Sequence, residues 1–580
     1  MIVNSFTWKI GGRAGEGIKV TGYILSKVFQ RLGLNVFGYI EYPSLVRGGH
    51  NVYQIRAEAG PAPSHLFHDN LLVALNQESV NLHHQELTPH AGIIYDPAKV
   101  KLTDHDLPDN VNPYPIPLLE LVKEAGAKPV MVNVVALGAT LQLLDIPFEY
   151  LEAVINDQFC EKGEAIVKSN VTVARKGYEY AKDNFDEKFN YTIKPMSAKP
   201  RVMLSGNEAI ALGAIHGGCN YYVAYPMTPS SSILDTMAAM ADKHGIMVKH
   251  AEDEIGVMNM AIGASYAGAR TMLGTSGGGF ALMGEGLGLA GMTETPLVIA
   301  EVQRPGPATG LPTWTEQGDL RMLMHAAQGE FPRIILAPGD IEEAFYLSAW
   351  ALNLAEKYQL PVFILSDKYL SESYLTAPVF DQKKIMIDRG KMLSDAEAGK
   401  ESDYKRYKVT ADGVSPRAIP GQPNTIFLAN SDEHDEYGYS EESSANRIAQ
   451  MDKRLKKCAV CRTEMPLPKL YGPAEAEFTF IAWGSMKGPV LEAMQMLKMS
   501  GIETNLLHLN IVWPFPTGKV EEVINNARTT ILVENNATSQ LGGIIREETG
   551  QHTDHQFLKY DGRPPHPHEL HEYVEKLKNK

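Results

Sequence analysis

The stretch Phe6-Thr-Trp-Lys-Ile10, followed at once by Gly11-Gly-Arg-Ala-Gly-Glu-Gly17, decides the fold of the first part of the chain. The five leading residues predict a strand, and the glycines predict a tight turn into a helix. One side of that helix is apolar or small: Ile18, Gly22, Leu25 and Phe29. A second strand is expected at 35–42. Strands that alternate with amphipathic helices are typical of an α/β architecture.

The same alternation predicts three α/β domains, at 1–190, 201–380 and 471–580. Residues 191–200 are expected to be a linker. Residues 381–470 are charged and poor in long apolar runs, so we expect an irregular connecting region with a helix at 444–457. The remaining strands are expected at 220–225, 247–252, 270–275, 296–302, 361–366, 478–483, 505–508 and 530–534. Helical runs rich in small residues, at 255–268 and 280–291, predict close packing against a neighbouring surface.

Composition excludes several classes of protein. The 580 residues include 54 Lys and Arg against 69 Asp and Glu, a net charge of −15, which disfavours a surface that coats nucleic acid. The sequence predicts no membrane-spanning helix, because no apolar run approaches the required length of about 18–20 residues. We also expect no secretory signal. Four cysteines in so long a chain fit a reducing compartment, and the predicted location is the cytoplasm.

The glycine-rich loop suits a phosphate-bearing ligand, because backbone N–H groups at a helix N-terminus can approach a phosphate closely. Gly12 and Gly17 have the outer spacing of the dinucleotide fingerprint, but Ala14 occupies its middle position. Glu41 follows Gly12 too late to be the ribose-binding acid. NAD is therefore weakly supported, and a tight turn without any ligand is the alternative.

A second motif, Tyr225-Pro-Met-Thr-Pro-Ser-Ser231, follows a predicted strand directly. Ser230 or Ser231 could simply cap the next helix. Capping does not explain Thr228, whose hydroxyl lies between two prolines at the carboxyl end of a strand. That end is the usual ligand side of an open α/β sheet.

Two further motifs carry charge at the same kind of position. In Lys249-His-Ala-Glu-Asp-Glu254, the acids could merely complement the dipole of the next helix, but Glu252 falls at the predicted strand end. In Gln303-Arg-Pro-Gly-Pro-Ala-Thr-Gly-Leu-Pro-Thr313, Arg304 lies in a stiff loop and could bind a carboxylate or a phosphate through two hydrogen bonds. An ordinary solvated arginine is the alternative.

Taken together and in this order, the motifs resemble the alpha subunit of 2-oxoacid:ferredoxin oxidoreductases with a gamma-type domain fused at its N-terminus. Met227 replaces the usual isoleucine of the family's Tyr-Pro-Ile-Thr-Pro motif. The resemblance covers nearly the whole chain and implies a gamma-type domain, a thiamine-enzyme pyrimidine-binding-like domain and a transketolase C-terminal-like domain. It includes four further stretches: Arg47-Gly-Gly49, Ala251-Glu-Asp-Glu254, Thr275-Ser-Gly277 and Glu433-His-Asp-Glu436.

The resemblance implies thiamine diphosphate chemistry, in which a 2-oxoacid is decarboxylated, electrons pass to ferredoxin and an acyl-CoA forms. Glu252 matches the glutamate that hydrogen-bonds N1′ of the pyrimidine and so promotes the imino tautomer, with Asp253 and Glu254 as competing assignments. The implied cofactor contacts also include Tyr225 and Pro226. The implied substrate contacts are Thr228, Arg304 and Thr313. Pro305 and Ala308 depart from the expected glycine and serine and leave acid selectivity open.

Other implied features belong to a partner. The chain lacks the Gly-Asp-Gly…Asn signature for diphosphate and magnesium, and its four cysteines do not match a [4Fe–4S] ligand set. The resemblance therefore implies no metal ligand here, magnesium and the cluster on a beta subunit, and a dimer of heterodimers. Cys458-x-x-Cys461 is the only close cysteine pair. The histidines at 83–84 and 566–571 are expected to be solvated.

Coenzyme A is expected to contact the first and last domains, through Gly12, Gly15, Gly17 and Lys487. The role of Glu433-His-Asp-Glu436 does not follow from its sequence. The fused form favours 2-oxoglutarate, with conversion to succinyl-CoA or the reverse carboxylation. Alternatives are pyruvate, branched-chain or indolepyruvate enzymes, or a noncatalytic subunit that binds CoA or a nucleotide.

Overall fold

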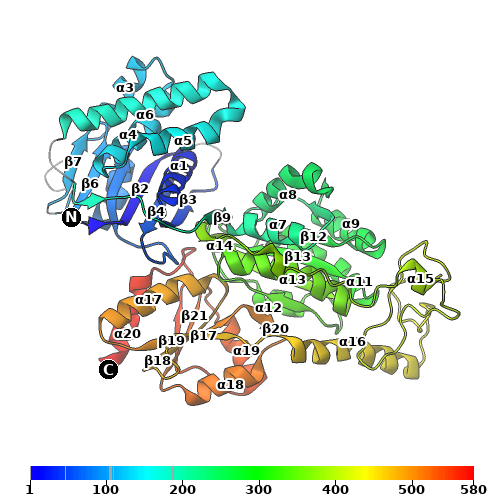
Figure 1. Ribbon diagram of the computed structural model, residues 1–580. Coiled ribbons are helices and arrows are strands. Elements are labelled where there is room, and N and C mark those ends of the chain that lie inside the picture. Colours follow the sequence, from blue (N-terminus) through cyan, green and yellow to red (C-terminus); the bar gives the residue numbers. More distant parts are fainter. Residues whose placement is uncertain (1, 46–47, 103–106, 109, 186–188, 580) are drawn as a thin grey trace. The chain divides into compact units, whose positions relative to one another are not determined.

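The computed structural model describes residues 2–45, 48–102, 107–108, 110–185 and 189–579, and the chain divides into two compact units (Figure 1). The N-terminal unit comprises Met1–Leu204, Glu372–Phe380 and His566–Glu572. The larger unit comprises Ser205–Ser371, Asp381–Pro565 and Tyr573–Lys580. Arg47 of the predicted Arg-Gly-Gly motif lies outside the described residues.

The N-terminal unit is built on an eight-stranded sheet in the order β7-β6-β5-β2-β4-β3-β16-β9. β2 (Ser5–Arg13) contains the predicted strand and lies parallel to β5 (Asp69–Ala74) and antiparallel to β4 (His50–Glu58). β1 (Ile2–Val3) pairs with β8 (Tyr191–Thr192), so part of the predicted linker is a strand. The other strands are β3 (Asn35–Glu41), β6 (Leu87–Tyr95), β7 (Asn112–Pro115), β9 (Arg201–Ser205) and β16 (Tyr374–Pro378).

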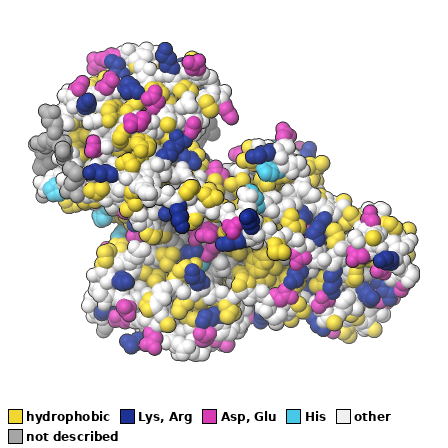
Figure 2. All heavy atoms as spheres, viewed as in Figure 1, with side chains coloured by type: hydrophobic (Ala, Val, Ile, Leu, Met, Phe, Trp, Pro, Cys, Tyr) yellow, Lys and Arg dark blue, Asp and Glu magenta, His cyan; other side chains and the backbone are white. Residues whose placement is uncertain are grey.

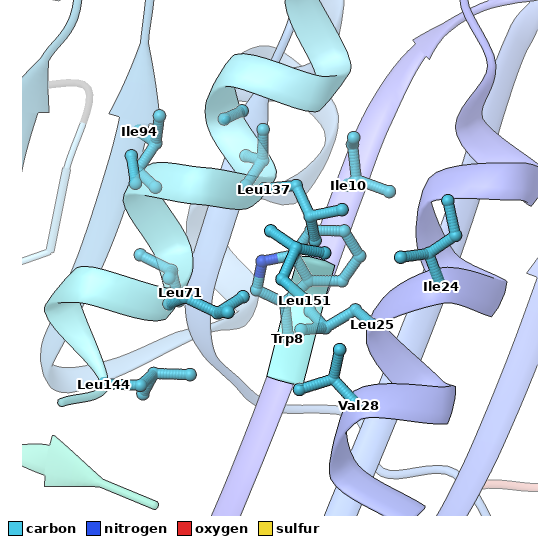
Figure 3. Close-up of a cluster of buried hydrophobic side chains, with 14 of the residues drawn as sticks. Trp8, Ile10, Ile24, Leu25, Val28, Leu71, Ile94, Leu137, Leu144 and Leu151 are labelled. Carbon is cyan, nitrogen blue, oxygen red and sulfur yellow. The ribbon is translucent and has the colours of Figure 1, made fainter. Parts of the chain in front are cut away.

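Helix α1 (Ile18–Arg31) buries the apolar side that the sequence predicts, and its Leu25 and Val28 join Trp8 and Ile10 in one core (Figure 3). Helices α4 (Val132–Leu143) and α6 (Glu164–Asn184) approach each other so closely that a Cβ on Gly138 or Gly177 would overlap a backbone oxygen of the other helix. The other α-helices of this part of the chain are α2 (Gln77–His83), α3 (Leu118–Glu124) and α5 (Phe148–Phe159).

The larger unit contains a seven-stranded sheet in the order β11-β10-β12-β13-β15-β14-β20, in which only β20 runs antiparallel to its neighbour. All seven residues of β13 are buried, as expected for a parallel strand covered on both faces. The strands are β10 (Tyr221–Ala224), β11 (Met247–His250), β12 (Thr271–Thr275), β13 (Leu297–Gln303), β14 (Ile334–Leu336), β15 (Pro361–Asp367) and β20 (Ile511–Trp513). Five of them lie where the sequence predicts strands.

The helices of this part of the larger unit also follow the predicted alternation. Gly286 of α11 lies against Met258 of α9, so these two helices, both rich in small residues, pack together as expected. The helices are α7 (Gly206–His216), α8 (Ser231–His244), α9 (Glu254–Tyr266), α10 (Gly277–Phe280), α11 (Gly284–Met292), α12 (Leu320–His325), α13 (Ile341–Tyr358) and α14 (Lys368–Glu372).

A five-stranded sheet in the order β17-β19-β18-β21-β22 completes the larger unit. One hydrophobic core joins it to the seven-stranded sheet, because Ile299 and Phe363 share that core with Trp483 and Leu507. Two of the three predicted domains therefore form one compact unit. The elements are β17 (Lys469–Tyr471), β18 (Phe478–Trp483), β19 (Thr504–Leu509), β21 (Thr530–Glu534), β22 (His555–Leu558), α17 (Lys487–Met499), α18 (Thr517–Asn526), α19 (Gln540–Thr549) and α20 (Pro567–Lys578).

Residues 381–468 contain helices α15 (Asp395–Ala398) and α16 (Ser444–Glu464), a short 3-10 turn and no strand. The helix predicted at 444–457 therefore continues for two further turns. Buried charges hold this segment in place: Lys453 and Lys457 of α16 form ion pairs with Glu294. Burying ions is tolerated only when they are paired in this way.

The Glu433-His-Asp-Glu436 motif has a structural role within the same segment. Glu433 accepts hydrogen bonds from Arg454 of α16, at 2.8 Å, and Glu436 accepts one from the Val409 N–H, at 2.9 Å. His434 is fully buried between them. The motif thus fastens two loops to α16.

The surface is mixed in charge. Figure 2 shows acidic and basic side chains interspersed over the visible face of the N-terminal unit. Within the described ranges, no helix combines the length and the apolarity that a membrane crossing requires.

Candidate active site

The candidate residues of the larger unit come together because parallel strands end at the same edge of a sheet. Ala224 of β10 pairs with His250 of β11 on one side and with Gly274 of β12 on the other. Thr275 of β12 pairs with Glu301 of β13. The loops that carry Thr228, Glu252 and Arg304 therefore leave neighbouring strands at one edge.

The three acids after β11 occupy different environments. Glu252 is exposed, and Asp253 caps α9 by accepting a hydrogen bond from the Gly256 N–H at 2.6 Å. Glu254 is only 6% exposed, and its carboxylate has no hydrogen bond or ion pair with any described residue. A Cβ placed on Gly279 would stand 2.7 Å from Glu254 Oε1, so this glycine leaves room for the carboxylate. Glu254 is therefore the acid held in a protected position.

The arginine and threonines predicted to bind substrate are also close together. Arg304 Nη1 donates a 2.7 Å hydrogen bond to the Thr228 carbonyl oxygen. Arg304 Nε and Thr313 Oγ1 are sealed from solvent without a hydrogen-bond partner among the described residues. Burial lowers the pKa of Arg304, while the charge of Asp319 raises it. Unsatisfied buried polar atoms are costly, so this group is suited to receiving a polar ligand.

Three other residues of the Tyr225–Ser231 motif lie near Thr228: Tyr225, Pro226 and Ser230. Tyr225 is exposed, and its ring centroid lies 6.1 Å from that of His250. Pro226 is also exposed. Ser230 stands at the N-cap of α8 but does not cap it, because its hydroxyl donates to the Met227 carbonyl oxygen at 2.7 Å.

Sequence reasoning missed two acidic residues at this edge, Glu301 and Asp319. Glu301 is fully buried, and neither of its carboxyl oxygens has a donor among the described residues. The available signal was an acid within Leu297-Val-Ile-Ala-Glu-Val-Gln303, a strand that is otherwise apolar except at its last residue. Ser276 Oγ, beside them in the Thr275-Ser-Gly277 motif, is likewise buried and unpartnered.

In the N-terminal unit, the glycine loop makes contacts of its own. The Arg13 N–H donates to Glu16 Oε2 at 2.7 Å, so a carboxylate of the loop occupies one of its donors. Gly17 has φ +74° and lies against the Asn133 amide, and both features require glycine. Gly12 lies against Glu16, whereas Gly15 faces open space.

Lys487, the other residue expected to contact coenzyme A, is almost buried and forms ion pairs with Asp340, at 2.5 Å, and Glu343, at 2.6 Å. Burial lowers the pKa of Lys487, but attraction to these carboxylates outweighs it and holds the pKa above the ordinary value. Its ammonium group therefore binds helix α13 to α17.

Metal-binding groups do not cluster in the part of the chain that the structure describes, where no three His, Cys, Asp or Glu residues are placed to hold an ion. Cys458 and Cys461 are free thiols on α16. His83 contacts Glu86, and the ring of His566 lies 4.5 Å from that of His65.

Three family profiles match the chain in sequence order. Residues 7–180 match pyruvate ferredoxin/flavodoxin oxidoreductase. Residues 212–453 match "Pyruvate flavodoxin/ferredoxin oxidoreductase, thiamine diP-bdg". Residues 476–569 match pyruvate:ferredoxin oxidoreductase core domain II. These profiles place the chain in the class of pyruvate ferredoxin/flavodoxin oxidoreductases and include a thiamine diphosphate-binding domain.

Individual relatives identify the family more specifically than the profiles do. The alpha subunit of 2-oxoacid:ferredoxin oxidoreductase 2 from Aeropyrum pernix is 33% identical over 97% of this chain and 96% of its own. The 2-oxoglutarate synthase subunit KorA of Methanothermobacter thermautotrophicus is 32% identical over 63% of this chain and 96% of its own. The chain belongs to the 2-oxoacid:ferredoxin oxidoreductase family, as an alpha subunit.

A solved structure extends the likeness to three dimensions. The 2-oxoglutarate:ferredoxin oxidoreductase of Magnetococcus marinus, with 2-oxoglutarate, coenzyme A and succinyl-CoA bound, superposes with a TM-score of 0.92 at 33% identity. The match covers 99% of both chains. The predicted α/β fold and family are confirmed.

Proposed function

We propose that this chain is the alpha subunit of a 2-oxoglutarate:ferredoxin oxidoreductase. The reaction joins the succinyl group to coenzyme A, releases CO₂ and passes two electrons to ferredoxin, or runs in reverse. The observation that carries the proposal is the edge of the sheet at which Arg304 Nε and Thr313 Oγ1 are buried without a hydrogen-bond partner among the described residues and Glu254 is only 6% exposed.

The site fits the pyrimidine half of thiamine diphosphate. Bound thiamine supplies a carbanion at its thiazolium ring, which activates the oxoacid for loss of CO₂. The pyrimidine needs a carboxylate that is shielded from water and not already paired. Glu254 meets both conditions, whereas Glu252 is exposed and Asp253 caps α9. We therefore assign the N1′ contact to Glu254 rather than to Glu252.

Arg304, Thr228 and Thr313 are proposed to hold the substrate. The hydrogen bond to the Thr228 carbonyl fixes one end of the Arg304 guanidinium and leaves the buried Nε free to donate. A planar guanidinium suits a carboxylate, because two charge-assisted hydrogen bonds form in one plane. Tyr225 and Pro226 would line the cofactor side of this pocket. The second carboxylate of 2-oxoglutarate requires another cationic or polar anchor, from this chain or its partner.

The partner is proposed to be a beta subunit that carries magnesium, the diphosphate site and a [4Fe–4S] cluster, in a cytoplasmic dimer of heterodimers. Coenzyme A is proposed to contact the N-terminal unit near Gly12, Gly15 and Gly17. Gly15 is the most open of the three glycines. Lys487 is the weaker proposal, since two carboxylates already bind it.

Reconstitution tests the choice of substrate. The chain is co-purified with its beta partner, and CoA-dependent ferredoxin reduction is measured with 2-oxoglutarate, pyruvate, branched-chain oxoacids and indolepyruvate. We expect the highest kcat/KM for 2-oxoglutarate. Equal or better turnover of another oxoacid would refute the substrate, and no turnover of any would favour the noncatalytic alternative.

A further inference from the structure

Two acidic side chains beside Arg304 lack an assigned role. Glu301 lies on β13 with no exposed surface, and both of its carboxyl oxygens are sealed without a donor among the described residues. Asp319 stands at the N-cap of α12, yet its side chain does not cap that helix. An ionised carboxylate in such surroundings is strongly disfavoured, so Glu301 requires a proton or a partner.

The Asp319 carboxyl group lies against Gly277, close to Glu301, because Thr275, two residues before this glycine, pairs with Glu301, and Gln303 of the same strand binds the Asp319 N–H. Two carboxyl groups can share a hydrogen bond only when one of them carries a proton. Burial raises the pKa of Glu301 well above its usual value, and the hydrogen bond with Asp319 raises it further. Burial raises the pKa of Asp319 to about 6, while Glu301 and Arg304 act to lower it. Burial therefore favours the protonated form of Glu301, while Arg304 favours the charged form of Asp319.

The other charged and polar groups around Glu301 and Asp319 either have partners of their own or help to place Asp319. Asp367, at the end of β15, is already held by the Ser485 hydroxyl, at 2.5 Å, and by the Leu370 N–H, at 3.1 Å. Glu316 is partly exposed and contributes a like charge. A side chain on Gly277 would collide with the Asp319 carboxylate, so the glycine is needed for this placement. Gln303 Oε1 accepts a 3.0 Å hydrogen bond from the Asp319 N–H and fixes its backbone.

We propose that Glu301 and Asp319 share one proton and act together as positioning residues that hold Arg304 for the substrate carboxylate. The inference rests on the substrate role proposed for Arg304. One shared proton leaves a single negative charge beside the guanidinium, which orients it without adding a second charge that would repel an anionic substrate. Neither acid needs to touch the substrate.

Infrared spectroscopy tests the shared proton without any turnover. At pH 8, where solvated carboxyl groups are ionised, the wild-type chain should show the carbonyl band of a buried carboxylic acid. Glu301→Gln should remove that band, whereas Glu316→Gln should retain it. If Glu301→Gln leaves the band region unchanged, the proton is not on this pair and the inference fails.

Steady-state kinetics of the complex with the beta subunit test positioning. Asp319→Asn should raise KM for 2-oxoglutarate by about tenfold, with a smaller change in kcat, and abolish an inflection of KM near pH 6. Glu301→Gln should stay within about threefold of wild type, because the amide still donates to Asp319. A wild-type KM and pH profile in Asp319→Asn would overturn the inference. Absence of turnover in wild type would instead refute the proposed function, while the infrared result still reports on the pair.

Discussion

Substrate binding is expected to depend on the guanidinium group of Arg304. Its Nη1 is bound to the Thr228 carbonyl oxygen, and its Nε is buried and available. A lysine at this position could supply the charge but not the planar pair of donors. An arginine at this position therefore indicates a ligand with a carboxylate, which can accept both hydrogen bonds, rather than an anion held by charge alone.

Arg304→Lys should raise KM for the oxoacid by about ten- to hundredfold, with kcat less affected, because one charge-assisted hydrogen bond of about 1.5–3 kcal/mol is lost. Initial rates of ferredoxin reduction by the alpha–beta complex measure both constants. Arg321→Lys is the matched control, since the Arg321 side chain is 41% exposed and paired with Glu547. An unchanged KM in Arg304→Lys would remove Arg304 from the substrate site.

The candidate site residues come from separate sequence motifs. Thr228 and Arg304 were predicted from motifs far apart in the chain, and the structure brings them into contact. Glu252 was preferred over Glu254 because the strand was expected to end at Glu252. β11 ends two residues earlier, at His250, and Glu254 is the buried acid. Glu301 was missed because its role depends on Asp319, 18 residues away.

At the scale of elements, the buried ion clusters hold helix α13 against neighbouring segments. Glu356 of α13 forms ion pairs with Arg270, Arg389 and Arg417, and its side chain is 3% exposed. Arg389 and Arg417 belong to the irregular region. The cluster therefore joins a poorly patterned segment to the parallel sheet.

Glu356→Gln should destabilise the larger unit by about 3–5 kcal/mol, because three guanidinium groups would lose their buried counter-charge. Chemical denaturation followed by far-UV circular dichroism gives the free energy of unfolding. Glu547→Gln removes a solvated ion pair and should cost less than about 1 kcal/mol. If the two changes lower the free energy of unfolding equally, burial does not determine how much the Glu356 ion pairs contribute to stability.

Element positions followed closely from the sequence wherever strands were short and apolar. The strands at Phe478–Trp483 and Thr530–Glu534 have the predicted bounds. β14 and β20 were not predicted, since three apolar residues carry too little periodicity to indicate a strand. The helix predicted at 444–457 extends to Glu464, beyond the end that the sequence indicated.

At the scale of the whole molecule, long-range packing decided what the sequence could not. β20 crosses from the C-terminal region to the edge of the seven-stranded sheet, and one core serves both sheets. Local patterns predict where a sheet forms but not which sheets share a core. The regions expected as the second and third domains therefore lie in one compact unit.

The N-terminal unit should lose stability in acid. Burial lowers the pKa of His50 from 6.5 to about 4, so the folded ring stays neutral where the unfolded one is protonated. The unfolded state binds more protons between these values, and this part of the stability falls as the pH drops from 6.5 to 4. Glu86 adds the same sign below pH 4.5, since His83 and Lys9 lower its pKa to about 2 despite burial. Burial raises the pKa of Asp69, which opposes the trend.

Native-state hydrogen exchange of the β2 and β4 amides measures this pH dependence. We expect protection to fall from pH 6.5 to 4 in the wild type and to fall less in His50→Asn. His244→Asn changes an exposed histidine and should follow the wild type. If His50→Asn has the same pH slope as the wild type, His50 is not the group responsible.

The carboxylate of Glu254 is proposed to activate thiamine diphosphate bound between this chain and its partner. The most direct measurement is the rate of hydrogen–deuterium exchange at the thiazolium C2 of thiamine diphosphate bound to the complex, followed by NMR after acid quench. Glu254→Gln should slow this exchange by about 10²- to 10⁴-fold, and Glu252→Gln should leave it near the wild-type rate. A wild-type exchange rate in Glu254→Gln, with cofactor still bound, would contradict the account.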